Sequence, residues 1–194
     1  MGLSQSDYEW AAKELSCDIA TVKAVEEVES KGKGFLPNGN PVILFEAHIF
    51  SKLTNHKYDK THPDISSRVW NRRLYATGSN YIDRGMKELQ RLEKASSLDR
   101  DAALQSASWG KFQIMGMNWK ISGYPSLQAF INAMYKDERS QLEAFVGFCK
   151  GKKLDKHLKN KDFDAFAAGY NGPSYKANRY DEKIESAYSR YSKS

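Results

Sequence analysis

The sequence has 194 residues, of which 40% are hydrophobic and 28% are charged, and such a chain forms one domain with a full hydrophobic core. Its 13 glycines, 5 prolines and two cysteines exclude a low-complexity protein and a disulfide-rich scaffold. The formal net charge is +6, although the first 30 residues carry seven acids and only two bases. The strongly basic remainder predicts a polyanionic partner, and nucleic acid, an anionic membrane and the bacterial wall all meet that description.

The first 30 residues are predicted to form two helices. Ser6 and Glu9 have the spacing of a capping box, which begins a helix that reaches about residue 15. Asp18 is a residue type that caps helices, and it begins a second helix over residues 19–30. The glycines that follow, in Lys31-Gly32-Lys33-Gly34, end this second helix.

A small hairpin is predicted directly after the second helix. The pair Asn38-Gly39 stands between two apolar runs, which is the strongest short signal for a hairpin turn. Pro37 and Pro41 bracket the turn and favour a place at the edge of a sheet. Residues 42–45 form the one strand that the pattern predicts, in a chain that is otherwise expected to be mostly helical.

The rest of the chain is predicted to be loop and helix. Residues 51–80 are polar and are expected to form a loop with short helical pieces. The longest helix is expected from Ser126 to about Cys149, with its apolar stripe in the core. The other helices are predicted to begin at about residue 81, at Ser97 or Asp99, after Asp162, and at about residue 177.

Glu29 is the first candidate for chemistry. On a helical wheel it lies in the same arc as Val22 and Val25, on the apolar face of the second helix and just before its glycine end. Burial there raises the pKa of a carboxyl group, which a general acid needs at neutral pH. The alternative is a structural glutamate that pairs with an arginine or caps the next turn.

Two further segments combine residues that suit a binding site. Residues 106–116 join Trp, Gln and Met with two glycines, which permit close approach of a ligand or, as the alternative, of a neighbouring helix. Residues 167–173 end in Tyr-Asn-Gly-Pro, which is an ordinary helix stop. That stop also presents a phenol and an amide together, a pair that suits sugar hydroxyls.

Three segments resemble, in their order along the chain, the signature blocks of goose-type lysozymes and soluble lytic transglycosylases. They are Glu29-Ser30, Gly-x-x-Gln-Ile-Met at 110–115 and Tyr-Asn-Gly at 170–172. More closely, the chain resembles the phage N-acetylmuramidase endolysin family, in the stretches AVEEVESKGKGF, PVILFEAHIF, HPDIS, SASWGKFQIMG and AAGYNGPSY. The resemblance implies a lysozyme-like fold of the α+β class, mostly helical, with the small hairpin after the catalytic helix. It also implies a single catalytic domain over residues 1–194, without a separate wall-binding module.

The activity implied by the resemblance is cleavage of the β-1,4 bond between N-acetylmuramic acid and N-acetylglucosamine in peptidoglycan. Glu29 matches the catalytic acid of the family. Glu46 is the nearest later acid, and it either positions water and supports Glu29 or serves as a structural residue; Asp59 and Asp64 are poorer candidates. If no second acid acts, attack by the N-acetyl group of muramic acid gives an anhydro sugar, as in the lytic transglycosylases.

The resemblance also implies a set of sugar-binding residues. Gln113 and Tyr170 match positions that line the sugar cleft of the transglycosylases, where they are expected to bind N-acetyl groups. Asn171 and Ser106 are weaker members of that wall. His48, near the end of the predicted strand, is a further candidate for substrate binding. No metal and no cofactor are expected, because the four histidines share no metal-ligand spacing and the chain has no Cys-x-x-Cys motif.

A lysine-rich segment is the candidate for contact with a polyanion. The six lysines are expected to hold the enzyme on the anionic wall or the outer-membrane surface, or else to form a solvated face: Lys150, Lys152, Lys153, Lys156, Lys159 and Lys161. The rival hypothesis is a basic helical nucleic-acid-binding protein, which leaves Glu29 and the ordered motifs unexplained. No nucleic-acid partner is therefore expected, and the protein is expected to be a monomer.

Location and redox state follow from what the sequence lacks. The start, MGLSQSDYEW, shows no signal peptide, and no stretch of 18 apolar residues exists to span a membrane. Together with this lack, the resemblance to phage endolysins implies a protein held in the host cytoplasm before lysis, which acts on the wall after release through a separate pore. Cys17 and Cys149 are expected to be free thiols, with one disulfide between them as the alternative.

Overall fold

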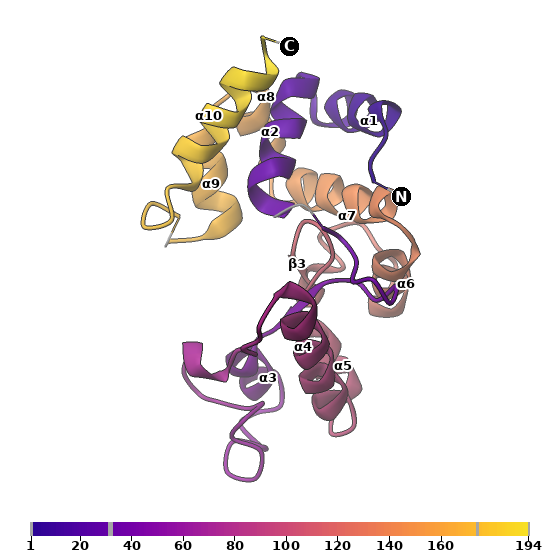
Figure 1. Ribbon diagram of the computed structural model, residues 1–194, viewed down its shortest axis with the longest axis vertical. Coiled ribbons are helices and arrows are strands. Elements are labelled where there is room, and N and C mark those ends of the chain that lie inside the picture. Colours follow the sequence, from indigo (N-terminus) through magenta and orange to yellow (C-terminus); the bar gives the residue numbers. More distant parts are fainter. Residues whose placement is uncertain (1, 31–32, 174, 194) are drawn as a thin grey trace.

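Two groups of helices flank a small central sheet in the computed structural model of the chain, which describes residues 2–30, 33–173 and 175–193 (Figure 1). The upper group in Figure 1 consists of α1 (Gln5–Leu15), α2 (Ile19–Ser30), α7 (Glu138–Gly151), α8 (Asp155–Lys159), α9 (Phe163–Asn171) and α10 (Tyr180–Tyr191). The lower group consists of α3 (Ala47–Leu53), α4 (Tyr81–Ser96) and α5 (Arg100–Gln105). Beside the sheet lies α6 (Leu127–Lys136), and two 3-10 helices, η1 (Arg72–Leu74) and η2 (Gly116–Asn118), lie in the connections. The expected α+β, mostly helical class is confirmed.

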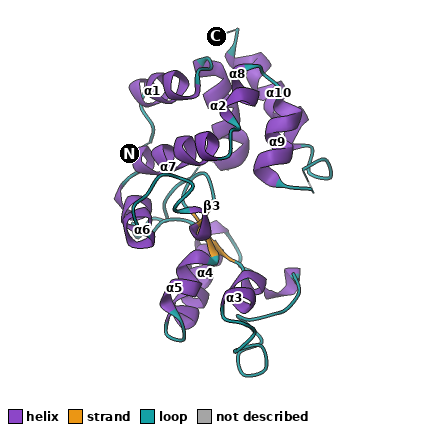
Figure 2. Cartoon of the chain, turned by 180° about the vertical axis from the view of Figure 1, so that it is seen from behind, coloured by secondary structure: helices purple, strands orange, loops and turns teal. Residues whose placement is uncertain are grey.

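The sheet has three antiparallel strands, β1 (Ile43–Phe45), β2 (Ala107–Trp109) and β3 (Ile114–Met115), in the order β1-β2-β3. Seen from behind, it lies between α7 above and α4 and α5 below (Figure 2). The predicted strand 42–45 is therefore present, but its partner is β2, with Ile43 opposite Trp109. The turn around Asn38-Gly39 forms only one bridge, between Phe35 and Pro41. Residues 107–109 and 114–115 are strands joined by a turn, so this segment is not the helix crossing that was the alternative.

Several helices begin at a side chain that caps them, but α10 begins at Tyr180, later than predicted, after Arg179, which forms no side-chain cap. Two further predictions about helix bounds are corrected. The first helix begins earlier than predicted, because Ser4 and Asp7, not Ser6 and Glu9, form the capping box. The predicted long helix 126–149 is two helices, since Asp137 is fully extended at φ −168° and ψ 170°. Its side chain accepts a hydrogen bond from the backbone N–H of Ser140 and so begins α7. The apolar stripe is interrupted between Met134 and Leu142, where the chain breaks, and most of its residues are buried on the two helices.

The core confirms the predicted stripe and the state of the cysteines. Phe130, Met134, Leu142 and Phe145 are fully buried, at 0% exposure. The thiol of Cys149 is also fully buried, and both cysteines are free, as expected. Among the described residues, no helix is long and apolar enough to cross a membrane.

Candidate active site

Glu29 lies in the last turn of α2 and is half-buried. Its helix is anchored by Val22 and Val25, which are 1% and 0% exposed. The side-chain amide of Asn171, at the end of α9, donates a hydrogen bond of 2.8 Å from Nδ2 to Glu29 Oε1. Burial raises the pKa of Tyr180, and the charge of Glu29 adds to that effect. The ends of α2 and α9 and the start of α10 therefore meet around this carboxyl group.

Tyr170 is adjacent to this group and is partly buried, with its ring packed against the hydrophobic core. Its ring stacks on Phe166, with centroids 5.3 Å apart, and meets Phe145 and Phe148 edge-on. Its hydroxyl donates a hydrogen bond of 2.7 Å to the carbonyl oxygen of Phe112. Burial raises the pKa of Tyr170 well above its usual value, and the charge of Glu29 contributes. Tyr170 thus ties α9 to the β2–β3 loop, and its predicted sugar contact stays a prediction.

Gln113 holds the β2–β3 loop in its strained shape. Its backbone has φ +50°, and its side-chain Nε2 donates to the carbonyl oxygens of Gly110 at 2.8 Å and Val42 at 3.4 Å. Gly110 has φ +67°, and a Cβ there would lie 2.5 Å from the side chain of Gln141, so only glycine fits. Both hydrogen bonds of Gln113 use the amide nitrogen, which leaves Oε1 without a donor among the described residues.

Lys111 connects three elements at the same loop. Its ammonium group is 2.9 Å from Glu26 on α2 and 3.1 Å from Glu138 on α7, and the lysine side chain is only 6% exposed. Burial lowers the pKa of Lys111, but the two carboxylates outweigh burial and raise it. The backbone N–H of Lys111 donates to Gln141 Oε1 at 2.7 Å. This buried ion triad fixes the last turns of α2, and hence Glu29, against the loop.

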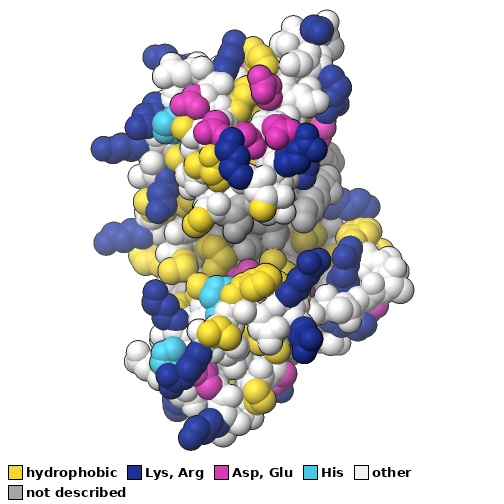
Figure 3. Space-filling view, turned by 90° about the vertical axis from the view of Figure 1, so that its left-hand side faces the viewer, with side chains coloured by type: hydrophobic (Ala, Val, Ile, Leu, Met, Phe, Trp, Pro, Cys, Tyr) yellow, Lys and Arg dark blue, Asp and Glu magenta, His cyan; other side chains and the backbone are white. Residues whose placement is uncertain are grey.

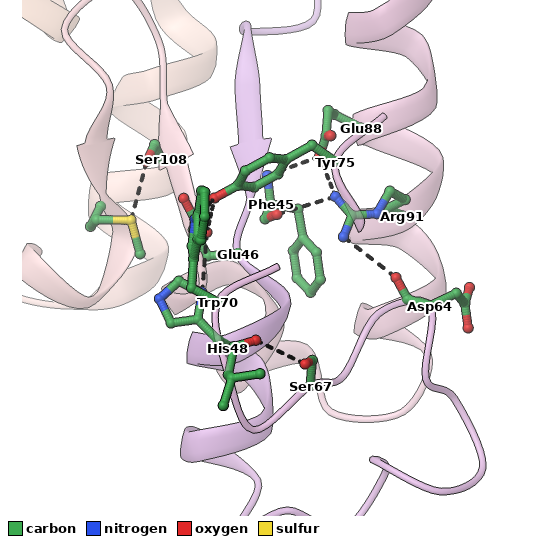
Figure 4. A network of polar contacts seen from close by, with 12 residues as sticks. Phe45, Glu46, His48, Asp64, Ser67, Trp70, Tyr75, Glu88, Arg91 and Ser108 are labelled. Atoms are coloured by element: carbon green, nitrogen blue, oxygen red, sulfur yellow. Dashed lines mark hydrogen bonds and ion pairs between the residues drawn. The ribbon is translucent and has the colours of Figure 1, made fainter. Parts of the chain in front are cut away.

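Glu46 lies at the start of α3, directly after β1, in the lower half of the molecule. Its Oε2 accepts a hydrogen bond of 2.8 Å from the hydroxyl of Tyr75 and lies 3.3 Å from His48 Nδ1. Burial raises the pKa of Glu46, although Tyr75 and His48 favour the charged form and oppose that shift. Figure 4 shows Tyr75 and Trp70 on one side of this carboxyl group.

A second carboxylate supports the strand beside Glu46. Glu88, which is 4% exposed, accepts hydrogen bonds from the backbone N–H groups of Phe45 at 3.0 Å and Ala76 at 2.7 Å. Arg91 pairs with Glu88 at 2.8 Å and also donates to the Phe45 carbonyl oxygen at 3.2 Å. The end of β1 and the segment that carries Tyr75 are thereby joined through α4 (Figure 4).

Ser106 takes no part in a cleft wall, contrary to the prediction. Its side chain is 0% exposed, and its hydroxyl donates to the Ala102 carbonyl oxygen at 2.6 Å. The carbonyl oxygen of Ser106 accepts the backbone N–H of Glu46 at 2.9 Å. Burial at a helix end therefore gives Ser106 a structural role behind Glu46.

The predicted residues thus form two groups. Glu29, Tyr170 and Asn171 belong to the upper group of helices, whereas Glu46 and His48 belong to the lower one. Figure 3 shows a groove between the two halves, with hydrophobic side chains along its lower margin. Each half also has a hollow of its own. One of about 770 Å³ is bordered by Val28 and Tyr180, and one of about 480 Å³ is bordered by Tyr75 and Arg91.

The sequence reasoning missed Tyr75, Trp70 and Lys111. The first two lie in the polar segment 51–80, where their only signal is that large aromatic residues stand among basic ones. Lys111 lies inside a recognised motif, but its two partners are far away in the sequence. Among the residues that the structure describes, no three His, Cys, Asp or Glu side chains are placed to hold a metal ion. The expected lack of a metal or cofactor stays a prediction.

Comparisons with known proteins identify the family. The family model of N-acetylmuramidases (Muramidase) matches residues 18–192. Among solved structures, the chain is similar to the endolysin of the Burkholderia phage AP3, with 41% sequence identity and a TM-score of 0.87. That match covers 99% of this chain and 72% of the endolysin chain. A search of the curated proteins found no match. The chain therefore belongs to the N-acetylmuramidase family and is a lysozyme-like endolysin of the phage N-acetylmuramidase type, a class of peptidoglycan-degrading enzymes.

Proposed function

We propose that this endolysin hydrolyses the β-1,4 bond between N-acetylmuramic acid and N-acetylglucosamine, with Glu29 as the general acid. The observation that carries the proposal is the hydrogen bond of 2.8 Å from Asn171 to Glu29 Oε1. It joins two of the three motifs and fixes the orientation of a half-buried carboxyl group at a helix end. A general acid must be held within reach of the leaving oxygen, so a fixed orientation favours this role.

In the proposed reaction, Glu29 gives its proton to the glycosidic oxygen as the bond to C1 of muramic acid breaks. Positive charge then develops on the ring of that sugar. Glu46 in its ionised form accepts a proton from the water that attacks C1, and Tyr75 and His48 hold its Oε2 in place. In the alternative, the N-acetyl group attacks C1 and the C6 hydroxyl then displaces it, which leaves a 1,6-anhydro end.

Mass spectrometry of digested peptidoglycan tests the bond and the outcome together. Reducing muramic acid ends are expected; 1,6-anhydro ends favour the alternative, and reducing glucosamine ends contradict the proposal. Glu29→Gln is expected to abolish clearing on a peptidoglycan gel. Its matched control is Glu27→Gln on the same helix, whose side chain is 38% exposed and pairs with Arg190.

The Glu46→Gln variant distinguishes the two possible roles of Glu46, as a catalytic base or as a structural residue. A loss of activity comparable to that of Glu29→Gln, with unchanged thermal unfolding, is expected for a catalytic base. Activity near that of the unaltered enzyme makes Glu46 a structural residue and favours attack by the N-acetyl group.

The proposed wall-binding surface consists of the six exposed lysines between the end of α7 and the start of α9. Lys150 pairs with Glu14 at 2.8 Å and Lys161 with Asp18 at 3.2 Å. The other four have no ion-pair partner among the described residues, so they remain available to a polyanion: Lys152, Lys153, Lys156 and Lys159.

Co-sedimentation of the Glu29→Gln protein with cell walls tests this surface, because that variant leaves the wall intact. Changing the four available lysines to Gln is expected to weaken binding and its dependence on salt. A control with the same loss of charge replaces four dispersed lysines: Lys13, Lys120, Lys136 and Lys183. Equal binding by both variants contradicts a localised surface.

A further inference from the structure

The lower half of the molecule exposes an apolar side chain that the proposed reaction does not use. Trp70 is 59% exposed and its neighbour Val69 is 68% exposed, whereas Trp109 in the sheet is 1% exposed. They lie in the loop that precedes η1. Large exposed apolar groups are costly in water and often mark a binding surface.

The indole of Trp70 is fixed in place. Its Nε1 donates a hydrogen bond of 2.6 Å to the hydroxyl of Tyr75, and the two rings meet edge-on with centroids 6.2 Å apart. The loop itself is closed by a hydrogen bond of 2.8 Å from the Ser67 hydroxyl to the Val69 carbonyl oxygen. Because its polar edge is satisfied within the protein, the indole offers an apolar surface of defined orientation.

This indole is joined to the candidate second carboxylate. The Tyr75 hydroxyl accepts from Trp70 and donates to Glu46 Oε2, so two successive hydrogen bonds connect the indole with that carboxylate. Figure 4 shows the Trp70 ring standing beside Glu46, with His48 close by. Any ligand that covers the indole therefore lies next to polar groups that bind hydroxyl and amide groups.

A pyranose ring has the matching chemistry. One face of the ring presents C–H groups that stack on an aromatic surface, while its edge carries hydroxyl and N-acetyl groups for polar partners. We infer that Trp70 is a stacking platform for a sugar ring of the glycan strand, beside the bond that is cleaved. This inference rests on the proposed function for its ligand.

Glycan binding to the full-length Glu29→Gln protein tests the platform, with the tetramer of N-acetylglucosamine as the probe. Saturating probe is expected to shift the tryptophan emission and to protect Trp70 from oxidation by N-bromosuccinimide, located by mass spectrometry. Trp70→Ala is expected to weaken the affinity about threefold to tenfold, as the loss of one aromatic stack does. Trp70→Phe keeps an aromatic face and is expected to retain most of the affinity.

Val69→Ala is the matched control, since it removes apolar surface from the same loop without touching the indole. Equal affinity of Trp70→Ala and Val69→Ala, with all variants unfolding at the same temperature, overturns the inference. Protection of Trp70 by phosphatidylglycerol vesicles but not by the tetramer also overturns it, because the indole then meets lipid. The ends produced by the unaltered enzyme test the proposed function separately, so a failure of one is distinguishable from a failure of the other.

Discussion

The Lys111→Met substitution tests how the candidate acid is held. In the intact protein, one buried ammonium group lies between Glu26 and Glu138, whose side chains are 15% and 12% exposed. Methionine fills a similar volume but leaves two nearly buried carboxylates facing each other without a cation. Removing one member of a buried ion pair costs about 3–5 kcal/mol in the free energy of unfolding. For a chain of this size, that cost lowers the melting temperature by about 6–20 °C.

Calorimetry measures this decrease in melting temperature, and two further variants show whether the loss of the buried cation causes it. Lys150→Met breaks an exposed pair with Glu14, which solvent screens, and is expected to change the melting temperature little. Adding Glu26→Gln and Glu138→Gln to Lys111→Met removes the stranded charges and is expected to restore much of the stability. If Lys111→Met costs no more than Lys150→Met, the triad does not hold α2 against the loop and the reasoning is refuted.

Three further predictions concern separate parts of the molecule. Tyr75→Phe removes a hydrogen-bond donor that favours the ionised form of Glu46, so the pKa of Glu46 rises. The acidic limb of the activity–pH profile is therefore expected to move to higher pH. If that limb does not move, Glu46 does not titrate in the reaction. Gly116→Ala is expected to destabilise the fold by several kcal/mol, because its Cβ would lie 2.0 Å from the Leu104 carbonyl oxygen; urea unfolding near that of the unaltered protein contradicts this close approach. Burial raises the pKa of the Cys149 thiol and shields it, so alkylation at pH 8 is expected only in denaturant; rapid labelling of the folded protein, located by mass spectrometry, refutes that expectation.

Much of the helical architecture is encoded locally. A helix cap involves residues three positions apart and an apolar stripe repeats every turn, so both are visible in the sequence. The second helix with Glu29 at its end, the cap at Asp162 and the buried stripe of α6 and α7 were therefore predictable. The cap at Asp137 and the polar residues 137–141 were also local signals, but the apolar residues on both sides favoured one long helix. The resemblance to N-acetylmuramidases, carried by the ordered motifs, is confirmed by the family match.

The sequence by itself thus determined the class of fold, the family and the candidate acid, while the tertiary structure decided what surrounds them. The pairing of Ile43 with Trp109, the burial of Ser106 and the triad at Lys111 each join distant segments. The same holds for the connection from Trp70 through Tyr75 to Glu46, which begins in a segment that shows no periodicity. Such contacts depend on which surfaces meet after the helices pack, and no short-range pattern of residues records that choice.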